Sequence, residues 1–271
     1  MNNNNFTYNR FKILSKKQSD LELSKKLLAV ISELEKHDYE NKTVKYLGDQ
    51  YFENEISVDE ISNYLSKKQD DIIVFSNETK EFNIFLTEEI CGDGIYDCLW
   101  FSFNSLINDF PKTPDLKPFF ELLKSMFNSF KGLYAYSEDE QILQVYFAEK
   151  SYNQVISQLP FEYQKFVPRP NLDIINHFNI PAHYTINKID ITQVPNGFWW
   201  INFLSKNQIE NLNLNNSENS DWYYIEMVNK DCNMYVLTET FLNINSNDHL
   251  YKLQNLIIKT ELISKQEKFK K

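Results

Sequence analysis

Glycine is scarce in this sequence of 271 residues, which contains only five. No glycine-rich loop of the G-x-G-x-x-G or Walker type is present, so the backbone cradle that phosphate groups require is missing. An HExxH helix, a nucleophile elbow and a Cys-His signature are also missing. Carboxylate pairs such as Glu88-Glu89 are too common in an acidic chain to indicate a general acid and base. The sequence therefore predicts neither a nucleotide enzyme nor any other enzyme.

Long hydrophobic runs are absent too. No stretch approaches the roughly 20 consecutive apolar residues of a membrane helix, and the opening MNNNNFTYNRFK lacks the apolar segment of a signal peptide. The three cysteines, Cys91, Cys98 and Cys232, form no paired framework, which fits reduced thiols that fill the core. We therefore expect a cytoplasmic protein that does not bind a membrane.

Candidate metal and nucleic-acid sites are equally sparse. None of the four histidines lies at metal-ligand spacing from an acid or a cysteine, so we expect no metal site and no cofactor. The basic stretch at 265–271 is typical of the solvated end of a helix. We expect no nucleic-acid binding.

Negative charge is the feature that the sequence does have, and it is unevenly distributed. The net charge is −10, and the segment from Tyr46 to Asp97 contains thirteen acidic residues and three lysines, which accounts for the whole excess. Such a surface keeps a protein soluble, and it also steers association with a basic partner. The pattern alone favours the first interpretation, because charge patterns rarely define a function.

Strands and helices alternate along the chain. In the first half, capping boxes at 19–22 and 57–60 begin two helices, of which the first extends to about His37, and the apolar face at 116–130 predicts a third. Strands are predicted at 6–14, 72–76, 82–87, 95–103 and 133–136, with a glycine-rich turn at 91–94 and a further helix from 137 to about 152.

The second half repeats the order of strand, hairpin and helix. A strand at 198–204 leads into a short helix, strands at 222–228 and 234–238 form a hairpin, and a closing helix runs from 247 to about 262. The proline-rich stretch 159–173 resembles a linker. We predict an α+β fold of antiparallel sheets with flanking helices, in two related units at 1–158 and 159–271 that either stand apart or form one continuous domain.

An aromatic run, PNGFWWINFLSKNQIENLN, marks the second unit. Apolar residues would lie on both faces of a strand here, which is typical of a strand in the centre of a sheet. Core packing is therefore favoured over an exposed binding patch for Phe198, Trp199, Trp200, Ile201 and Phe203.

Four stretches in order carry a resemblance to a known family. They are FKILSKKQSDLELSKKLLAVISELEKHD, EISVDEISNYLSKKQ, PDLKPFFELLKSMFNSFKGLYAYSED and the second half from PNGFWW to IIKTELI. This order resembles the immunity protein 52 family and related immunity proteins of bacterial polymorphic-toxin and type VI secretion systems. The matching positions are Trp200, Phe203 and Leu204, then Leu237, Thr238 and Glu239, then 245–249. Asn211 or Asn213 replaces a glycine that relatives place after the short helix, and 141–179 matches less clearly.

The resemblance implies an immunity protein that binds one secreted toxin, often a nuclease, and occludes its active surface. An acidic inhibitor suits a nuclease, because a nuclease presents basic side chains to phosphates. The alternatives are a protein-binding scaffold or adaptor and, less favoured, an enzyme with dispersed catalytic residues. Charge alone nominates the partner-binding residues, which are Asp49, Glu53, Glu55, Asp59, Glu60, Asp70 and Asp71.

Overall fold

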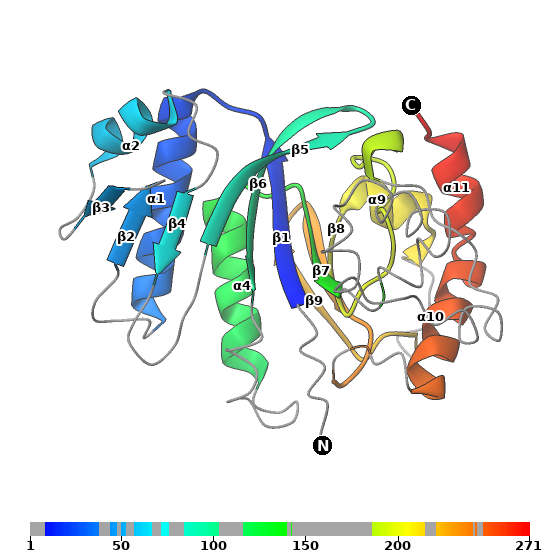
Figure 1. Cartoon of the computed structure of the whole chain (residues 1–271). Coiled ribbons are helices and arrows are strands. Elements are labelled where there is room, and N and C mark those ends of the chain that lie inside the picture. The colour runs from blue at the N-terminus through cyan, green and yellow to red at the C-terminus, as the bar shows by residue number, and fades with distance from the viewer. Residues whose placement is uncertain are drawn as a thin grey trace, which may run out of the picture.

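One antiparallel sheet crosses the whole molecule (Figure 1). The computed structural model describes residues 9–37, 44–47, 50–52, 57–66, 72–75, 84–102, 116–139, 142, 186–214, 221–240, 242 and 246–271. Within these residues the sheet has ten strands in the order β3-β2-β4-β5-β6-β1-β7-β8-β10-β9. Helices flank the sheet, so the predicted α+β class with antiparallel pairing is confirmed.

The strands of the first half make up seven of these ten positions. They are β1 (Asn9–Lys16), β2 (Val44–Leu47), β3 (Gln50–Phe52), β4 (Ile72–Phe75), β5 (Ile84–Cys91), β6 (Gly94–Ser102) and β7 (Tyr134–Asp139). The second half adds β8 (Ile201–Ser205), β9 (Tyr224–Asn229) and β10 (Cys232–Val236). The pairing of β7 with β8 joins the strands of the two halves, whereas the predicted boundary at 158–159 lies outside the described residues.

The helices of the first half are α1 (Asp20–Lys36), α2 (Val58–Leu65) and α4 (Lys117–Ser129), and those of the second half are α9 (Lys206–Asn211), α10 (Asn247–Lys259) and α11 (Leu262–Lys268). Four of the six described helices, α1, α2, α9 and α10, begin at a serine whose side chain caps them. Ser19 caps α1, while Ser57 and Ser205 form complete capping boxes with Glu60 and Gln208. Each cap satisfies backbone N–H groups that the first helical turn leaves without a partner.

The strand β1 lies in the centre of the sheet, between β6 and β7. Alternation along it sends Phe11, Ile13 and Ser15 to one face and Lys12 and Leu14 to the other. The first face packs against α1 and α4, where the ring of Phe203 contacts both Phe11 and Phe127. Figure 1 shows α1, α2 and α4 on one side of the molecule and α9, α10 and α11 on the other.

The large apolar side chains of the aromatic run are all buried, which confirms the prediction of core packing for Phe198, Trp199, Trp200, Ile201 and Phe203. The strand itself starts later than predicted, at Ile201, because the Asn202 side chain accepts a hydrogen bond from the Trp199 N–H and turns the chain there. The ring of Trp199 stacks on Tyr136, and β8 pairs with strands on both sides. The strand β8 is therefore an interior strand of the sheet, with a neighbour on each side.

Three predicted elements differ from the structure. The Ser137–Asp139 stretch does not begin a helix, since it continues β7 in register with β1. The strand β5 extends to Cys91 instead of ending at Thr87, because its ladder with β6 continues to the turn. The closing helix is broken at Glu261, whose φ of 53° is left-handed, so it divides into α10 and α11.

Two strands, β2 and β3, were not predicted. Each is very short, with four and three residues, and they pair with one another. The Gly48-Asp49 dipeptide between them is a recognised hairpin signal, and it is the only indication in the sequence.

The residue after the C-cap of α9 has a left-handed backbone. Asn213 has a φ of 56°, in the region that favours glycine. Asparagine tolerates this conformation better than most residues.

Candidate functional site

The predicted acidic surface is only partly described by the structure. Asp59 and Glu60 lie in the first turn of α2 and are exposed, whereas Asp49, Glu53, Glu55, Asp70 and Asp71 lie outside the described residues. Negative side chains in a first turn interact favourably with the helix dipole. These two positions therefore have a local structural role in addition to any role in binding.

Glu60 is committed to the capping box of α2. Its Oε2 accepts hydrogen bonds from the Ser57 N–H at 2.7 Å and the Ser57 hydroxyl at 2.8 Å, and the first of these bonds is the main reason that the pKa of Glu60 is lowered. The Glu60 carboxylate is thus charged, and it already accepts hydrogen bonds within the helix cap. Of the two, Asp59 is the better candidate for contact with a partner.

The hairpin of β5 and β6 carries four more acids of the Tyr46–Asp97 segment. Its turn is fastened to the second half of the chain: the Gly92 N–H donates to the Ile189 carbonyl at 2.9 Å, and Asp93 Oδ1 accepts from the Ile191 N–H at 3.3 Å. The second carboxylate oxygen of Asp93 accepts from the Tyr96 hydroxyl. Burial, helped by this bond, raises the pKa of Tyr96. Asp93 therefore anchors the turn.

Gly92 permits this attachment because it has no side chain. A Cβ at this position would lie 2.6 Å from both the N and the O of Ile189. Such a distance is far inside van der Waals contact. The hairpin turn and the stretch at 189–191 could not approach as they do with any larger residue.

The opposite side of the same hairpin faces outward. Ile90 and Ile95 are directly paired and have exposed fractions of 64% and 49%. Beside them Glu88 forms an exposed ion pair with Lys17. The sequence analysis did not select these isoleucines, although the alternation of Ile84, Leu86 and Glu88 already places Ile90 on the same face.

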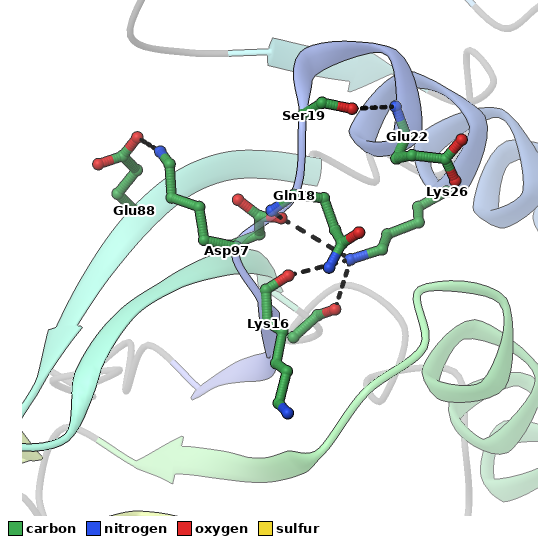
Figure 2. A network of polar contacts seen from close by, with 9 residues as sticks. Lys16, Gln18, Ser19, Glu22, Lys26, Glu88 and Asp97 are labelled. Atoms are coloured by element: carbon green, nitrogen blue, oxygen red, sulfur yellow. Dashed lines mark hydrogen bonds and ion pairs between the residues drawn. The ribbon is translucent and has the colours of Figure 1, made fainter.

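A buried ion pair joins α1 to β6 (Figure 2). Lys26 extends from α1 toward β6, with its Nζ 3.7 Å from Asp97 Oδ2, and both side chains are almost fully buried. The ammonium also donates to the Ser15 hydroxyl at 2.6 Å and to the Lys16 carbonyl at 3.3 Å. Asp97 Oδ2 accepts from the Gln18 N–H at 3.1 Å. The network fixes α1 to the ends of β1 and β6.

Burial dominates the titration of this pair. It raises the pKa of Asp97 and lowers the pKa of Lys26, and each opposite charge only partly offsets the shift. Burying this pair therefore costs free energy, and the hydrogen bonds to each charge offset part of that cost. We interpret it as a structural connection, because both side chains are inaccessible to a partner.

A second charge cluster lies on the other face of the sheet. Lys12 Nζ lies 2.9 Å from Glu138 Oε2 and 3.8 Å from Glu89 Oε2. These two carboxylates raise the pKa of Lys12 despite its burial, and burial raises the pKa of Glu89. Two carboxylates thus share one ammonium.

The cysteines are unsuited to nucleophilic chemistry. All three are free and buried, and burial raises the pKa of each thiol, to about 12 for Cys98. A nucleophilic cysteine needs a lowered pKa and access to solvent. Within the described parts of the chain, no cluster of three or more histidine, cysteine or acidic residues could hold a metal ion, and no described helix is long and apolar enough to cross a membrane.

Comparison with known proteins gives a distant similarity to a solved structure. No protein-family model and no curated protein sequence matches the chain. The chain is similar to Pseudomonas aeruginosa T6SS protein PA0821, with 11% sequence identity and a TM-score of 0.48. The alignment covers 95% of this chain and 73% of that chain. The resemblance to the immunity protein 52 family therefore depends on the sequence stretches and the order of their elements.

The residues that resemble the immunity protein 52 family lie in or next to β8, α9, β10 and α10. Phe203 and Leu204 lie in β8, Trp200 directly precedes it, and the capped helix α9 follows. The stretch Leu237–Glu239 comes directly after β10, and Ser246 caps α10. Trp200 and Leu237 are joined by a backbone hydrogen bond of 2.8 Å, from the Leu237 N–H to the Trp200 carbonyl. Trp200 and Leu237 are thus neighbours in the folded chain.

Proposed function

We propose that this chain is an immunity protein, which binds the domain of a secreted bacterial toxin and blocks it by covering its active surface. The observation that carries the proposal is the concentration of the entire net charge of −10 between Tyr46 and Asp97. The sequence resemblance supplies the class of partner. A toxin of the nuclease type fits the charge, because its phosphate-binding surface is basic.

The position of the acidic segment supports this proposal. Its described parts include β2, β3, β4 and α2, which Figure 1 shows together at one side of the molecule, with the β5–β6 hairpin nearer the centre. Charges gathered at one end produce a directional field that steers a basic partner toward it. The same charges evenly spread would only improve solubility.

Co-expression with the toxin tests the function directly. The toxin domain encoded immediately upstream is expressed in a sensitive host with and without this chain, and the expected result is that growth is restored. The immunity function is refuted if no toxin gene is adjacent or if the wild-type chain does not restore growth.

A matched pair of charge reversals tests the acidic mechanism separately. Asp49, Asp59 and Asp70 are replaced by lysine in one variant; Glu210, Glu239 and Glu267, exposed acids outside the segment, are replaced in the other. Both variants change the net charge equally. We expect rescue to fail only in the first variant, with both still folded by circular dichroism. Rescue by both variants would exclude electrostatic recognition through this segment.

A further inference from the structure

The strand β9 is an open edge of the sheet. Within the described residues it ends the sheet order and pairs on one side only, with β10. Every second N–H and C=O group along its other side is therefore available to a further strand. The strand at the opposite edge, β3, has only three residues, and very short edge strands are one way in which proteins prevent such pairing. Of the two edges, β9 is thus the one that can accept a partner strand.

The outward face of β9 carries no charge that would keep a partner strand away. The one acid of the strand, Glu226, points toward α4, where its Oε1 lies 2.7 Å from Lys124 Nζ. Alternation places Tyr223, Ile225 and Met227 on the other face. The exposed fractions of Tyr223 and Met227 are 46% and 70%. Edge strands are normally protected by an exposed charge or a proline, and this face of β9 has neither.

A second copy of β9 fits this edge in one particular antiparallel register. If a two-fold axis perpendicular to the sheet passes through Ile225, this residue faces its counterpart and Tyr223 faces Met227 of the second copy. The exposed apolar side chains of both copies are then paired. An axis through Glu226 would instead place two like charges opposite one another. The ladder of β9 with β10 is regular from Tyr224 to Met227, so the stretch that forms the contact is uninterrupted.

The distribution of charge favours a second copy as the occupant of this edge. Outside the Tyr46–Asp97 segment, acids and bases balance at 25 each, and beside β9 the carboxylate of Asp221 is paired with Lys259 at 2.6 Å. Four strands separate β9 from β6, the nearest strand of the acidic segment in the sheet order, which is about 24 Å along the sheet. The Debye length at physiological salt is about 8 Å. The acidic segments therefore do not oppose contact between two copies at β9.

We propose that two copies of this chain pair through β9, antiparallel and about a two-fold axis, to form one continuous sheet. Backbone hydrogen bonds between the two strands hold the contact, and the paired apolar side chains define its register. This inference does not depend on the proposed function. In the dimer both acidic segments remain free, in the outer halves of the joined sheet.

Sedimentation velocity of the full chain over a concentration series tests the proposal, and we expect the wild type to form a dimer. In the variant Tyr223→Lys/Met227→Lys, lysines of the two copies would face one another, so the dissociation constant should rise by roughly 30-fold or more. The mixed-charge variant Tyr223→Lys/Met227→Glu should remain a dimer, because each lysine then faces a glutamate of the second copy. The two variants change the same positions and differ only in the sign of one charge.

The variant Tyr251→Lys/Ile258→Lys is the matched control. It places the same two charges on α10, at a tyrosine and an aliphatic residue whose exposed fractions are 47% and 62%. It should sediment like the wild type. Thermal melts establish that the variants are folded, and if the variant with two lysines on β9 melts early, the mixed-charge variant still tests the register.

The opposite results would overturn the inference. A wild-type chain that stays monomeric up to about 200 μM does not pair through β9 at any useful affinity. A dimer that persists with two lysines on β9, or that is lost in the α10 control, has its contact elsewhere. A monomeric mixed-charge variant would exclude the two-fold pairing through Ile225. None of these results affects the growth test of the proposed function, so the two proposals can fail independently.

Discussion

The buried Lys26–Asp97 pair gives the sharpest test of what stabilises this fold. The change Lys26→Met keeps the length and apolar character of the side chain but removes its charge. Asp97 Oδ2 would then retain the Gln18 N–H bond and lose the ammonium, while the Ser15 hydroxyl and the Lys16 carbonyl would lose their donor. Removing one partner from a buried ion pair costs about 3–5 kcal/mol.

The double variant Lys26→Met/Asp97→Asn separates the cost of an unpaired charge from the value of the pair. The asparagine carbonyl still accepts from the Gln18 N–H, and no buried charge is left. We therefore expect the double variant to lie within about 1.5 kcal/mol of the wild type, more stable than Lys26→Met alone. This result would give a coupling energy of about 2 kcal/mol or more between the two positions.

Urea unfolding followed by circular dichroism and tryptophan fluorescence measures these differences. Coincident transitions by the two probes are needed before free energies are compared. A loss of 3 kcal/mol corresponds to a decrease in Tm of roughly 6–12 °C for a domain of this size. A Lys26→Met variant that loses less than about 1 kcal/mol, or losses that simply add in the double variant, would refute the reasoning.

The same pair also predicts a pH dependence. Because the pKa of Lys26 is lowered in the folded state from its ordinary 10.5, the unfolded chain binds more protons between the folded pKa and 10.5. The wild type should therefore gain stability relative to the double variant as pH rises through that window. The pKa of Asp97 is raised in the folded state from its ordinary 3.8, so the folded chain binds more protons between 3.8 and the folded pKa. The wild type should therefore lose stability relative to the double variant as pH rises through this second window.

Substitutions at three further positions test individual features. Ser57→Ala removes the cap of α2 and should cost about 1 kcal/mol in urea unfolding. Gly92→Ala places a Cβ against the Ile189 backbone; it should cost about 1–3 kcal/mol and speed amide exchange at Ile191, since the turn must move away. Asn213→Ala should cost about 1 kcal/mol because of its left-handed φ, whereas Asn213→Gly should cost nothing, as thermal melts of the two variants would show.

Local patterns were sufficient to predict the class of fold and most of its elements. Capping residues such as Ser57 and Ser205 identify helix starts because the cap forms within four residues of sequence. The paired strands β9 and β10 were predicted for the same reason, since only Lys230 and Asp231 separate them. These elements could be predicted because their signals lie within a few residues of sequence.

Features that depend on distant neighbours were not predictable. Ser137 reads locally as a helix cap, yet pairing with Phe11 on β1 places it in a strand. The break at Glu261 has no glycine or proline to mark it. The same holds for the candidate site, because the attachment of Gly92 to Ile189 spans almost a hundred residues.

Buried charges and exposed apolar side chains near the β5–β6 hairpin should respond differently to substitution. Lys26 and Asp97 are buried, so changing them should lower the free energy of unfolding of the whole chain. Ile90 and Ile95 are exposed, so changing them should leave that free energy within about 0.5 kcal/mol of the wild type. Lys26→Met should therefore lower Tm, whereas variants of the two isoleucines should not change it.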